Sequence, residues 1–396
     1  MPSEASVIVH ICPCYVDLEK EMGGVANIVR QLTLGPARRG REVVVICGNR
    51  ELGTVVSEPK VEDVDTDAGS IRVHVLRQRA HPLLGPTRAL RNTLAELDRP
   101  FVGHVHTCFS AFTESAMRHM AKSGIPFAFT PHGKLSPEFL QQHYWPKRVW
   151  WRLLARDRVL RASAVALSSA AESRAFGALG LPDRFSVIPN GYVKPADPPE
   201  EVDVQPPPAP YILFLGAIDP RKQPEFLVRA FAASKSSESH KLVFVGPDSY
   251  DHKKHVLHTI ARCGCEEQVI FWGPAYGREK WRLLDEATCF ALPSRAEGLP
   301  VVLCEALGAG LPILISDSCN FHEAAVEGAA LEMDDFDAAR WADAIDSVCL
   351  NPKRHEEMAS AARKMAPRHT WDFIVERWLA LYDELARSTA ENTSQA

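Results

Sequence analysis

Short apolar runs alternate with longer amphipathic stretches along the first half of the chain. Strands are predicted for the apolar runs at residues 7–12, 43–47, 71–76, 102–106, 126–130, 165–167 and 186–188. Apolar residues recur at helical spacing between them, in residues 25–39, 87–97 and 114–122. Strands that alternate with helices favour a parallel, doubly wound sheet, so we expect an α/β domain here.

The same alternation starts again after a proline-rich segment. Residues 195–210 contain seven prolines and four acids, which is the composition of a stiff connector. Beyond it we predict strands at 211–215, 241–245, 269–272, 290–293 and 312–315, and helices at 225–233, 255–263, 279–286 and 299–307. The rest is helical, at 338–350, 352–365 and 371–385, with a polar tail that we expect to fray. The chain thus divides into domains at 1–194 and 211–370, the connector 195–210, and a final helix with its tail at 371–396.

Composition and charge narrow the class of protein. The 396 residues are 46% hydrophobic and 24% charged, as in a globular protein with a sizeable core, and the net charge of −5 argues against a nucleic-acid binder. The N-terminus has no basic segment, and the apolar run 7–12 is too short for a signal peptide or membrane span. The ten cysteines include no C-x-x-C, and the C-x-C pairs lack zinc-site partners. We therefore expect a cytoplasmic protein with reduced thiols and no metal.

Two glutamates bracket the predicted helix at 299–307. Glu297 precedes its first turn and Glu305 lies eight residues later, about 12 Å along the helix axis. An anionic group at this helix N-terminus would meet backbone N–H groups and the positive end of the dipole. Taken alone, Glu297 has an ordinary explanation as a cap-region charge, and Glu305 as a solvated side chain. The segment is made unusual by its flanking residues Gly298, Pro300, Gly308, Gly310 and Pro312.

Three loops that follow predicted strands carry candidate ligand-binding groups. Gly23 and Gly24 stand at a strand-to-helix turn, where a phosphate could approach the backbone closely. Arg221 and Lys222 follow the strand 211–215, at the edge where two cations would clamp a diphosphate. His132 follows the strand 126–130 and could hydrogen-bond a substrate. Each feature has an ordinary alternative: a turn glycine, a solvated basic loop, or a histidine satisfied by the backbone.

Two further segments have more than one interpretation. Residues 144–161 combine three tryptophans and six basic residues with one acid. They either lie on an anionic membrane surface or near an anionic acceptor, or pack their tryptophans on the sheet and solvate their arginines. Residues 65–67, Asp-Thr-Asp, are similar to the Asp-x-Asp that holds a metal and diphosphate in another class of sugar-transferring enzymes. Because we predict no strand leading into them, we interpret them as a solvated loop.

Residues 290–315 resemble the signature of retaining glycosyltransferases of family 4, which have the GT-B fold. The shared pattern is Pro-Ser, Glu-Gly, Glu-Ala and Gly-x-Pro, with seven residues between the two glutamates. The Gly23-Gly24 turn and the segments 130–133, 188–191, 214–223 and 244–247 follow in the family's order, so the resemblance covers nearly the whole chain. It implies two Rossmann-like domains facing each other across a cleft. The first binds the acceptor, the second binds a nucleotide-sugar donor, and the final helix crosses back to the first.

The resemblance also implies roles for individual residues. Lys222 contacts the donor diphosphate, Glu305 holds the nucleotide ribose, and Glu297 holds hydroxyls of the transferred sugar, beside which His132 lies. The family's usual Gly-Arg is Gly216-Ala217 here, so we expect Arg221 to supply the missing charge. The expected catalytic residues are His132, Lys222 and Glu297, and the expected donor-binding residues are Gly23, Gly24, Gly216, Arg221, Lys222, Glu297, Gly298, Leu299, Pro300 and Glu305.

These expectations define one leading function and two alternatives. We expect transfer of a sugar from a UDP- or GDP-sugar to a carbohydrate or lipid-linked acceptor, in cell-surface polysaccharide or glycolipid synthesis. The reaction would retain configuration, require no metal or other cofactor, and occur in the cytoplasm, with residues 144–161 in peripheral contact with the membrane. The alternatives are a sugar-nucleotide epimerase or sugar phosphorylase of the same fold, which lack this glutamate pattern, and a two-domain sugar-binding protein.

Overall fold

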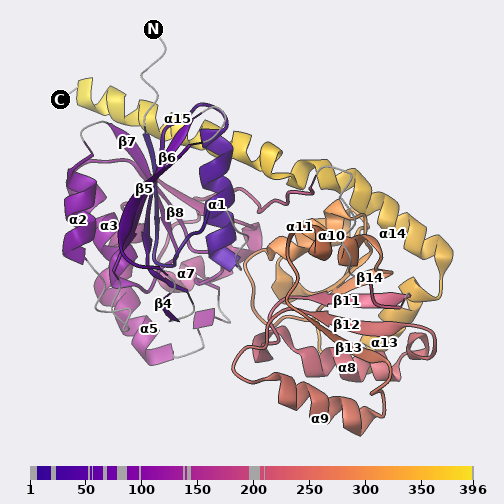
Figure 1. Cartoon of the computed structure of the whole chain (residues 1–396). Helices are drawn as coiled ribbons and strands as arrows, with labels where there is room; N and C mark the ends of the chain where they lie inside the picture. Colours follow the sequence, from indigo (N-terminus) through magenta and orange to yellow (C-terminus); the bar gives the residue numbers. More distant parts are fainter. Residues whose placement is uncertain are drawn as a thin grey trace. The chain divides into compact units, whose positions relative to one another are not determined.

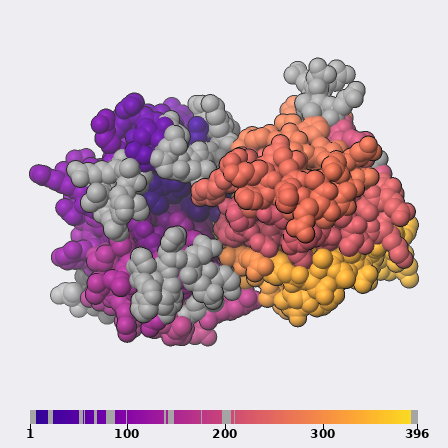
Figure 2. All heavy atoms as spheres, turned by 90° about the horizontal axis from the view of Figure 1, so that it is seen from below, coloured from indigo at the N-terminus to yellow at the C-terminus, as the bar shows by residue number. Residues whose placement is uncertain are grey.

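A computed structural model describes residues 7–18, 24–51, 54–55, 57–65, 69–77, 87–97, 100–136, 139–140, 144–195, 206–208 and 210–394; the others are grey in Figure 2. The chain divides into two compact units (Figure 1). The first unit comprises Met1–Pro189 and Trp371–Ala396, and the second comprises Asn190–Thr370. The division falls at Pro189 because the next residues bond within the second unit. The Asn190 amide donates to the Leu299 carbonyl, and the Tyr192 N–H donates to the His369 carbonyl.

The first unit is built on an eight-stranded sheet of order β10-β9-β8-β7-β1-β2-β6-β5. Its strands are β1 (Val7–Cys12), β2 (Val43–Gly48), β5 (Lys60–Asp65), β6 (Ser70–Leu76), β7 (Phe101–His106), β8 (Phe127–Thr130), β9 (Ala164–Leu167) and β10 (Ser186–Val187). Neighbouring strands are parallel except β5 and β6, which are antiparallel. Besides the sheet, β3 (Arg50–Glu51) and β4 (Thr54–Val55) form a small antiparallel pair. The predicted doubly wound sheet is confirmed.

The edge strand β5 corrects the interpretation of Asp65 as part of a loop without a preceding strand. Asp65 is the last residue of β5 and pairs with Ser70 of β6. Thr66 and Asp67 lie outside the described residues. Four of the six residues of β5 are charged and the other two are valines, and its side chains are half buried at most. Such a strand is stable at a sheet edge, where charge is tolerated, and its pattern lacks the apolar run of a buried strand.

Helices cover both faces of this sheet because successive residues of each strand point to opposite faces. Val43 and Val45 of β2 share a core cluster with residues of α1, whereas Val44 and Ile46 share one with residues of α2 and α3. The helices before the last are α1 (Gly24–Ala37), α2 (Thr87–Ala95), α3 (Ala111–Lys122), α5 (Tyr144–Trp150), the π-helix η2 (Trp151–Ala155), α6 (Arg156–Val159), the 3₁₀-helix η3 (Ala170–Ala175) and α7 (Phe176–Leu179).

The last helix, α15 (Trp371–Ser394), packs on the first unit beside α1 (Figure 1). Arg39 pairs with Asp372 and Glu376, and Arg41 pairs with Asp383 at 2.8 Å. The helix continues to Ser394, nine residues beyond the end predicted at residue 385. Alanine, glutamate and arginine are good helix formers, and neither glycine nor proline interrupts this segment. Among the described helices, none is both long and apolar enough to cross a membrane.

The second unit is an α/β unit with a six-stranded, wholly parallel sheet of order β13-β12-β11-β14-β15-β16. Its strands are β11 (Tyr211–Leu215), β12 (Lys241–Val245), β13 (Val269–Gly273), β14 (Cys289–Leu292), β15 (Ile313–Ser316) and β16 (Ala330–Met333). Its α-helices are α8 (Pro224–Ala233), α9 (Lys253–Cys263), α10 (Gly277–Asp285), α11 (Val301–Gly308), α12 (His322–Val326), α13 (Ala338–Cys349) and α14 (Pro352–Met365). Its 3₁₀-helices are η4 (Pro220–Lys222), η5 (Lys235–Glu238), η6 (Asp317–Cys319) and η7 (Ala366–His369).

The order of strands in the second unit brings two predicted loops together. β11 and β14 are adjacent and parallel, so the loops that follow them leave the same edge of the sheet. A backbone hydrogen bond of 2.8 Å joins the loops, from the Arg295 N–H to the Arg221 carbonyl. The ends of parallel strands are where open α/β sheets bind ligands, so this edge is the place to look for a site.

Candidate functional site

The loop after β11 places Lys222 against the backbone of Gly216. Gly216 has φ +149°, and a Cβ added to it would lie 3.2 Å from Cε and 3.3 Å from Nζ of Lys222. Asp219 caps the short helix η4, since its carboxylate accepts a 2.8 Å hydrogen bond from the Arg221 N–H. The absence of a side chain at Gly216 therefore makes room for the Lys222 ammonium group at the strand end.

The Lys222 ammonium group reaches the first of the two signature glutamates. Nζ of Lys222 lies 3.0 Å from Oε1 of Glu297, and the side chains are 12% and 11% exposed. The Ser294 hydroxyl donates to the same oxygen at 3.0 Å. The backbone of Glu297 is also held: its N–H donates to Ser318 and its carbonyl accepts from the Asn320 side chain. The carboxylate thus has a fixed position before any ligand arrives.

The charge state of Glu297 follows from these neighbours. Burial by itself would raise the pKa of the Glu297 carboxyl group. The positive charges of Lys222 and Arg221, with the hydrogen bonds from Lys222 and Ser294, outweigh burial and bring that pKa below its ordinary value. Glu297 is therefore an ionised hydrogen-bond acceptor near neutral pH. This state suits the binding of hydroxyl groups and does not suit the donation of a proton.

Four more of the predicted donor-binding residues lie close to this ion pair in the chain. Arg221, in η4 beside Lys222, is close enough to Glu297 for its positive charge to lower the pKa of the carboxyl group. Gly298 follows Glu297 directly, and the Leu299 carbonyl accepts a 2.6 Å hydrogen bond from Asn190. Pro300 is the N-cap of α11. Gly298, Leu299 and Pro300 thus lie in one segment of the second unit, between Glu297 and α11.

The second signature glutamate has a partner that the sequence analysis did not identify. Glu305 lies within α11, and its Oε1 is 2.7 Å from Nζ of Lys280 in α10. The two side chains are 9% and 6% exposed, for Lys280 and Glu305 respectively. Lys280 was missed because a lysine in an amphipathic helix usually faces solvent. The sequence did contain a signal for this partner. Glu305 lies in an otherwise apolar, buried turn with Leu303, Ala306 and Leu307, and a buried carboxylate needs a cation beside it.

Two predicted residues of the first unit have left-handed backbone conformations. Gly24, with φ +58°, begins α1 and is exposed, and no heavy atom lies within 4 Å of the position of its missing Cβ. Gly23 lies outside the described residues. His132 has φ +52°, in the loop after β8. The buried Glu172 carboxylate holds this loop by accepting from the Gly133 N–H at 2.7 Å.

His132 belongs to a group of four histidines that the sequence analysis did not predict. His10 of β1 pairs in register with His104 of β7, and His104 and His106 share a sheet face because they are two residues apart. Nε2 of His106 lies 3.0 Å from Nδ1 of His10, and Nδ1 of His106 lies 3.0 Å from Nε2 of His132. The signal, His-x-His in a strand, was visible in the sequence, but its alignment with His10 depends on strand pairing.

Three of these histidines are close enough together to be tested as metal ligands. Ligand atoms of His10, His104 and His106 lie within 4.8 Å of one another. Both nitrogens of the His104 ring, however, are already engaged: they contact the Tyr382 hydroxyl and the Thr130 hydroxyl at 2.8 and 2.9 Å. Ligands of one ion point their nitrogens at a common centre. These hydrogen bonds therefore fit a hydrogen-bonded cluster better than a metal site.

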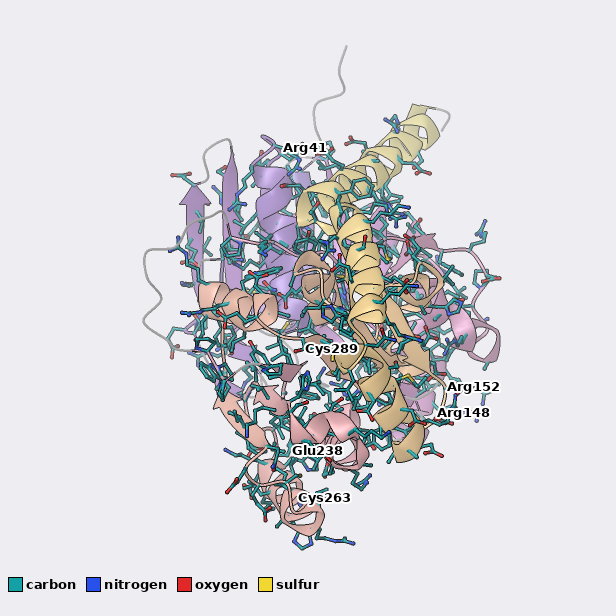
Figure 3. All side chains as sticks on the ribbon, turned by 90° about the vertical axis from the view of Figure 1, so that its right-hand side faces the viewer. Arg41, Arg148, Arg152, Glu238, Cys263 and Cys289 are labelled. Carbon is teal, nitrogen blue, oxygen red and sulfur yellow. The ribbon has the colours of Figure 1, made fainter. Side chains whose placement is uncertain are left out.

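Two tryptophans of the basic aromatic segment 144–161 pack within the first unit, as one of the interpretations considered for it predicted. Trp151 is buried and donates to the Leu179 carbonyl, and Trp150 donates to Glu114, which also pairs with Arg158 at 3.1 Å. On the outer side, large apolar and basic side chains are exposed, with Arg148 and Arg152 labelled in Figure 3. The exposed apolar residues are Val149, Leu153, Leu154 and Leu160.

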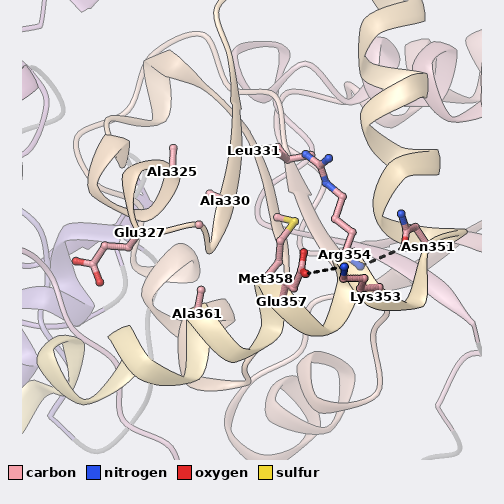
Figure 4. A pocket seen from close by; sticks show the side chains of 11 residues that line it. Ala325, Glu327, Ala330, Leu331, Asn351, Lys353, Arg354, Glu357, Met358 and Ala361 are labelled. Carbon is pink, nitrogen blue, oxygen red and sulfur yellow. Dashed lines mark hydrogen bonds and ion pairs between the residues drawn. The ribbon is translucent and has the colours of Figure 1, made fainter.

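A separate hollow of about 560 Å³ lies in the second unit, lined by residues of α12, β16 and α14 (Figure 4). Glu327, Leu331, Arg354 and Met358 are among its lining residues. None of the predicted catalytic or donor-binding residues lines it. The hollow is therefore distinct from the edge of the sheet at which Lys222 and Glu297 meet.

Two Rossmann-like units, with a loop and helix that carry the paired glutamates, define a glycosyltransferase of the GT-B fold. Residues 22–193 match the family model described as Glycosyltransferase Family 4, and residues 200–365 match the one described as Glycosyl transferases group 1. Together these matches cover most of the chain, which belongs to this family of glycosyltransferases, as the sequence resemblance predicted.

Relatives and solved structures agree with this assignment over the whole chain. A D-inositol 3-phosphate glycosyltransferase of Xylanimonas cellulosilytica is 24% identical, covering 98% of this chain and 97% of that protein. Sucrose-phosphate synthase of Thermosynechococcus elongatus has a TM-score of 0.77 at 18% identity, covering 97% of this chain and all of that one. HepE of Anabaena, in complex with UDP-glucose, has a TM-score of 0.68 at 18% identity, covering 98% of this chain and all of that one.

Proposed function

We propose that this chain is a retaining glycosyltransferase that moves a sugar from a UDP- or GDP-sugar to a carbohydrate or lipid-linked acceptor. The observation that carries the proposal is the buried ion pair of Lys222 and Glu297 at the ligand-binding edge of the second sheet. The similarity to HepE, which binds UDP-glucose, supports a nucleotide-sugar donor. The names of the inositol-phosphate glycosyltransferase and sucrose-phosphate synthase support a polyol or sugar acceptor. A place in polysaccharide or glycolipid synthesis is part of the same proposal.

The cations of the second unit would stabilise the leaving group. Breaking the anomeric C–O bond leaves negative charge on the nucleoside diphosphate. Lys222 has three N–H donors, and its bond to Glu297 leaves others for phosphate oxygens. Arg221 adds a second positive charge, and the N-terminus of α11 adds backbone N–H groups. These groups supply the charge stabilisation that a metal supplies elsewhere, so we propose a metal-independent reaction.

Glu297 and Glu305 would act as binding residues for hydroxyl groups. The lowered pKa of Glu297 keeps it ionised, so it accepts hydrogen bonds from sugar hydroxyls and has no proton to give. Glu305, fixed by Lys280, would accept hydrogen bonds from the ribose hydroxyls. No protein acid or nucleophile is assigned, so the acceptor hydroxyl would pass its proton to the leaving phosphate. The acceptor would then attack the face of the sugar ring from which the phosphate leaves. Attack on that face retains the anomeric configuration.

A donor and acceptor panel tests the proposal. Mass spectrometry would follow products from UDP- and GDP-sugars mixed with free-sugar, sugar-phosphate and lipid-linked acceptors, with and without a chelator. We expect a glycoside product, unchanged by chelation. Release of an epimerised free sugar without acceptor, or phosphorolysis, would identify one of the enzymes of the alternative class. Tight binding of free sugar without nucleotide or turnover would identify a sugar-binding protein.

Matched variants test the site itself. Lys222→Met keeps the aliphatic stem and removes the charge, so we expect affinity for UDP or GDP to fall about 10- to 100-fold, as for loss of a charged hydrogen bond. The control is Lys353→Met, because that lysine is 87% exposed in α14 of the same unit. Unchanged affinity and turnover in Lys222→Met and Glu305→Ala would refute the assignment of these residues.

We also propose peripheral membrane contact through η2 and its neighbours, on the cytoplasmic side. Val149 and Leu153 are 53% and 75% exposed, and Arg148 and Arg152 are exposed beside them. Apolar side chains among arginines suit an anionic lipid surface. Sedimentation with anionic vesicles should deplete the protein from the supernatant, and Arg148→Glu with Arg152→Glu should abolish this. The membrane proposal is refuted if the wild-type protein does not bind the vesicles, or if the wild type and the double variant bind them equally.

A further inference from the structure

The histidine cluster of the first unit has a direction that its hydrogen bonds determine. Nε2 of His10 lies 3.1 Å from the Leu32 carbonyl oxygen, which can only accept, so Nε2 carries the proton. In a neutral ring, Nδ1 of His10 is then an acceptor, and the facing Nε2 of His106 must donate to it. Nδ1 of His106 is the acceptor left over, so Nε2 of His132 donates in turn. The last nitrogen, Nδ1 of His132, is left with a lone pair and no proton.

Burial keeps the three rings of this chain neutral. It lowers the pKa of His10 to about 4 and that of His132 to about 3, and it lowers the pKa of His106 well below the ordinary value, with the neighbouring histidines adding to the effect. Two facing groups act in the same direction: His104 of β7 lowers the pKa of His106, and Lys134, in the turn after His132, lowers the pKa of His132. Tyr382 of α15 faces the His10 ring edge-on. Each ring near neutral pH therefore has one donor and one acceptor nitrogen.

The surrounding structure fixes the order of the rings. Trp378 of α15 stacks on His104 with ring centroids 4.4 Å apart, and the His104 ring lies tilted against His106 at 3.9 Å, so α15 covers the cluster on this face of the sheet. The left-handed backbone at His132, anchored through the bond from Gly133 to Glu172, turns its ring toward His106. Neither His10 nor His106 has any exposed surface, so neither can touch a ligand directly.

His132 is the member of the chain that remains accessible. Its side chain is half buried, and its Nδ1 has no hydrogen-bond partner among the residues that the structure describes. We propose that His10 and His106 are positioning residues that fix His132 as a hydrogen-bond acceptor toward a hydroxyl group of a bound sugar. This rests on the proposed function and on the sequence resemblance, which implies that His132 lies beside the transferred sugar. Such an acceptor favours an O–H group and disfavours groups that can only accept, such as a phosphate oxygen or a C–F group.

Nitrogen NMR of the full-length protein with ¹⁵N-labelled histidine tests the direction of the chain without any substrate. Protonated and unprotonated ring nitrogens have well separated shifts, and the spectrum of His132→Gln identifies the signals of His132. We expect neutral rings at neutral pH, protonated on Nε2, for His10, His106 and His132. A proton on Nδ1 of His132, a charged His132, or a stoichiometric transition metal in the purified protein would overturn the proposal.

A pair of variants at His10 tests the effect on the reaction. His10→Gln can still donate to the Leu32 carbonyl and accept from His106, whereas His10→Leu can do neither. We expect kcat/KM to fall roughly five- to tenfold in His10→Leu, about the value of one neutral hydrogen bond, together with loss of the single tautomer at His132. His10→Gln should restore both. Equal losses in the two variants would show a merely structural role and refute the proposal.

The two readouts separate failure of this inference from failure of the proposed function. If His132 has the expected tautomer but no pair of donor and acceptor gives a product, the proposed sugar transfer is refuted and the proposed positioning of His132 stands. If the enzyme turns over and His10→Leu changes neither the tautomer nor kcat/KM, the inference is wrong and the proposed function stands. Deoxyfluoro donors add a third readout. A donor that lacks the hydroxyl group bound by His132 should give the same kcat/KM with His10→Leu as with wild type.

Discussion

Removing Lys280 should destabilise the second unit because it leaves the Glu305 carboxylate buried without its lysine. The two groups are 2.7 Å apart, and both side chains are less than a tenth exposed. Breaking a buried ion pair from one side costs about 3–5 kcal/mol, most of it the burial of the remaining charge. We therefore expect Lys280→Met, which keeps the aliphatic stem, to lower the free energy of unfolding of this unit by about that amount.

The double variant Lys280→Met with Glu305→Gln shows whether charge is the cause. A neutral amide is much less costly to bury than a carboxylate, so the double variant should recover most of the loss and remain within about 1–2 kcal/mol of wild type. Lys353→Met is the matched control, since Lys353 and Glu357 are 87% and 64% exposed, and it should change stability by less than about 0.5 kcal/mol.

Urea titration followed by hydrogen exchange of peptides from α10 and α11 measures the stability of this unit apart from the other. The interpretation is refuted if Lys280→Met costs less than about 1 kcal/mol, far below the loss expected for a broken buried pair. It is also refuted if the double variant is as unstable as the single one, because the loss would then come from packing. In either case Glu305 would not depend on Lys280 for its position beside the proposed nucleotide.

Three further predictions follow from burial and close contact. The pKa of about 4 for His10 lies below the ordinary 6.5, so the unfolded chain binds more protons than the folded one and stability is lost as pH falls. Between pH 7 and pH 5 the free energy of unfolding should fall by about 2 kcal/mol through this group. Hydrogen exchange of β1 should show a smaller loss of stability over the same pH range in His10→Gln than in wild type. Gly35→Ala places a Cβ against the side chain of Val375 in α15, so thermal unfolding should show that the first unit loses about 1–3 kcal/mol of stability. The control is Gly177→Ala, whose added Cβ has no atom within 4 Å and which should change stability little. Gly216→Ala presses on Lys222 and strains a φ of +149°, so calorimetric titration with UDP or GDP should show roughly tenfold weaker binding, which would be contradicted by wild-type affinity.

The elements that the sequence predicted well are those whose residues are buried on both sides. β11 is fully apolar and β12 is apolar after Lys241, and the predicted bounds of both match the structure. β5 was missed because four of its six residues are charged, so it has no apolar run. α12 was missed because it has only five residues, and β16 because a glutamate interrupts its four residues. Pattern reasoning depends on burial, so it fails where an element is short or lies at an edge.

The residues of the candidate site that the sequence could indicate are those marked by their immediate neighbours. Glu297 and Glu305 stand out from the glycines and prolines around them, and Lys222 stands out from its place after a predicted strand. Lys280 and the histidine cluster were not found, because their partners come from elements whose pairing the sequence does not state. The register of β1 against β7 and the packing of α10 against α11 decide which polar groups become buried neighbours. A buried polar residue within an apolar stretch is the signal that such a partner exists.

Both signature glutamates prove to be bound to lysines of the same unit, and this changes what they can do. The lowered pKa of Glu297 keeps its carboxylate ionised beside the Lys222 ammonium group, so Glu297 does not suit the role of a proton donor. In the proposed function, each ion pair would also reduce the negative charge that a nucleoside diphosphate meets at this site. The further N–H groups of Lys222, together with Arg221, would then bind the phosphates, while the carboxylate oxygens would accept hydrogen bonds from hydroxyls. We expect the same pairs to let one site bind both the anionic and the neutral parts of a nucleotide-sugar.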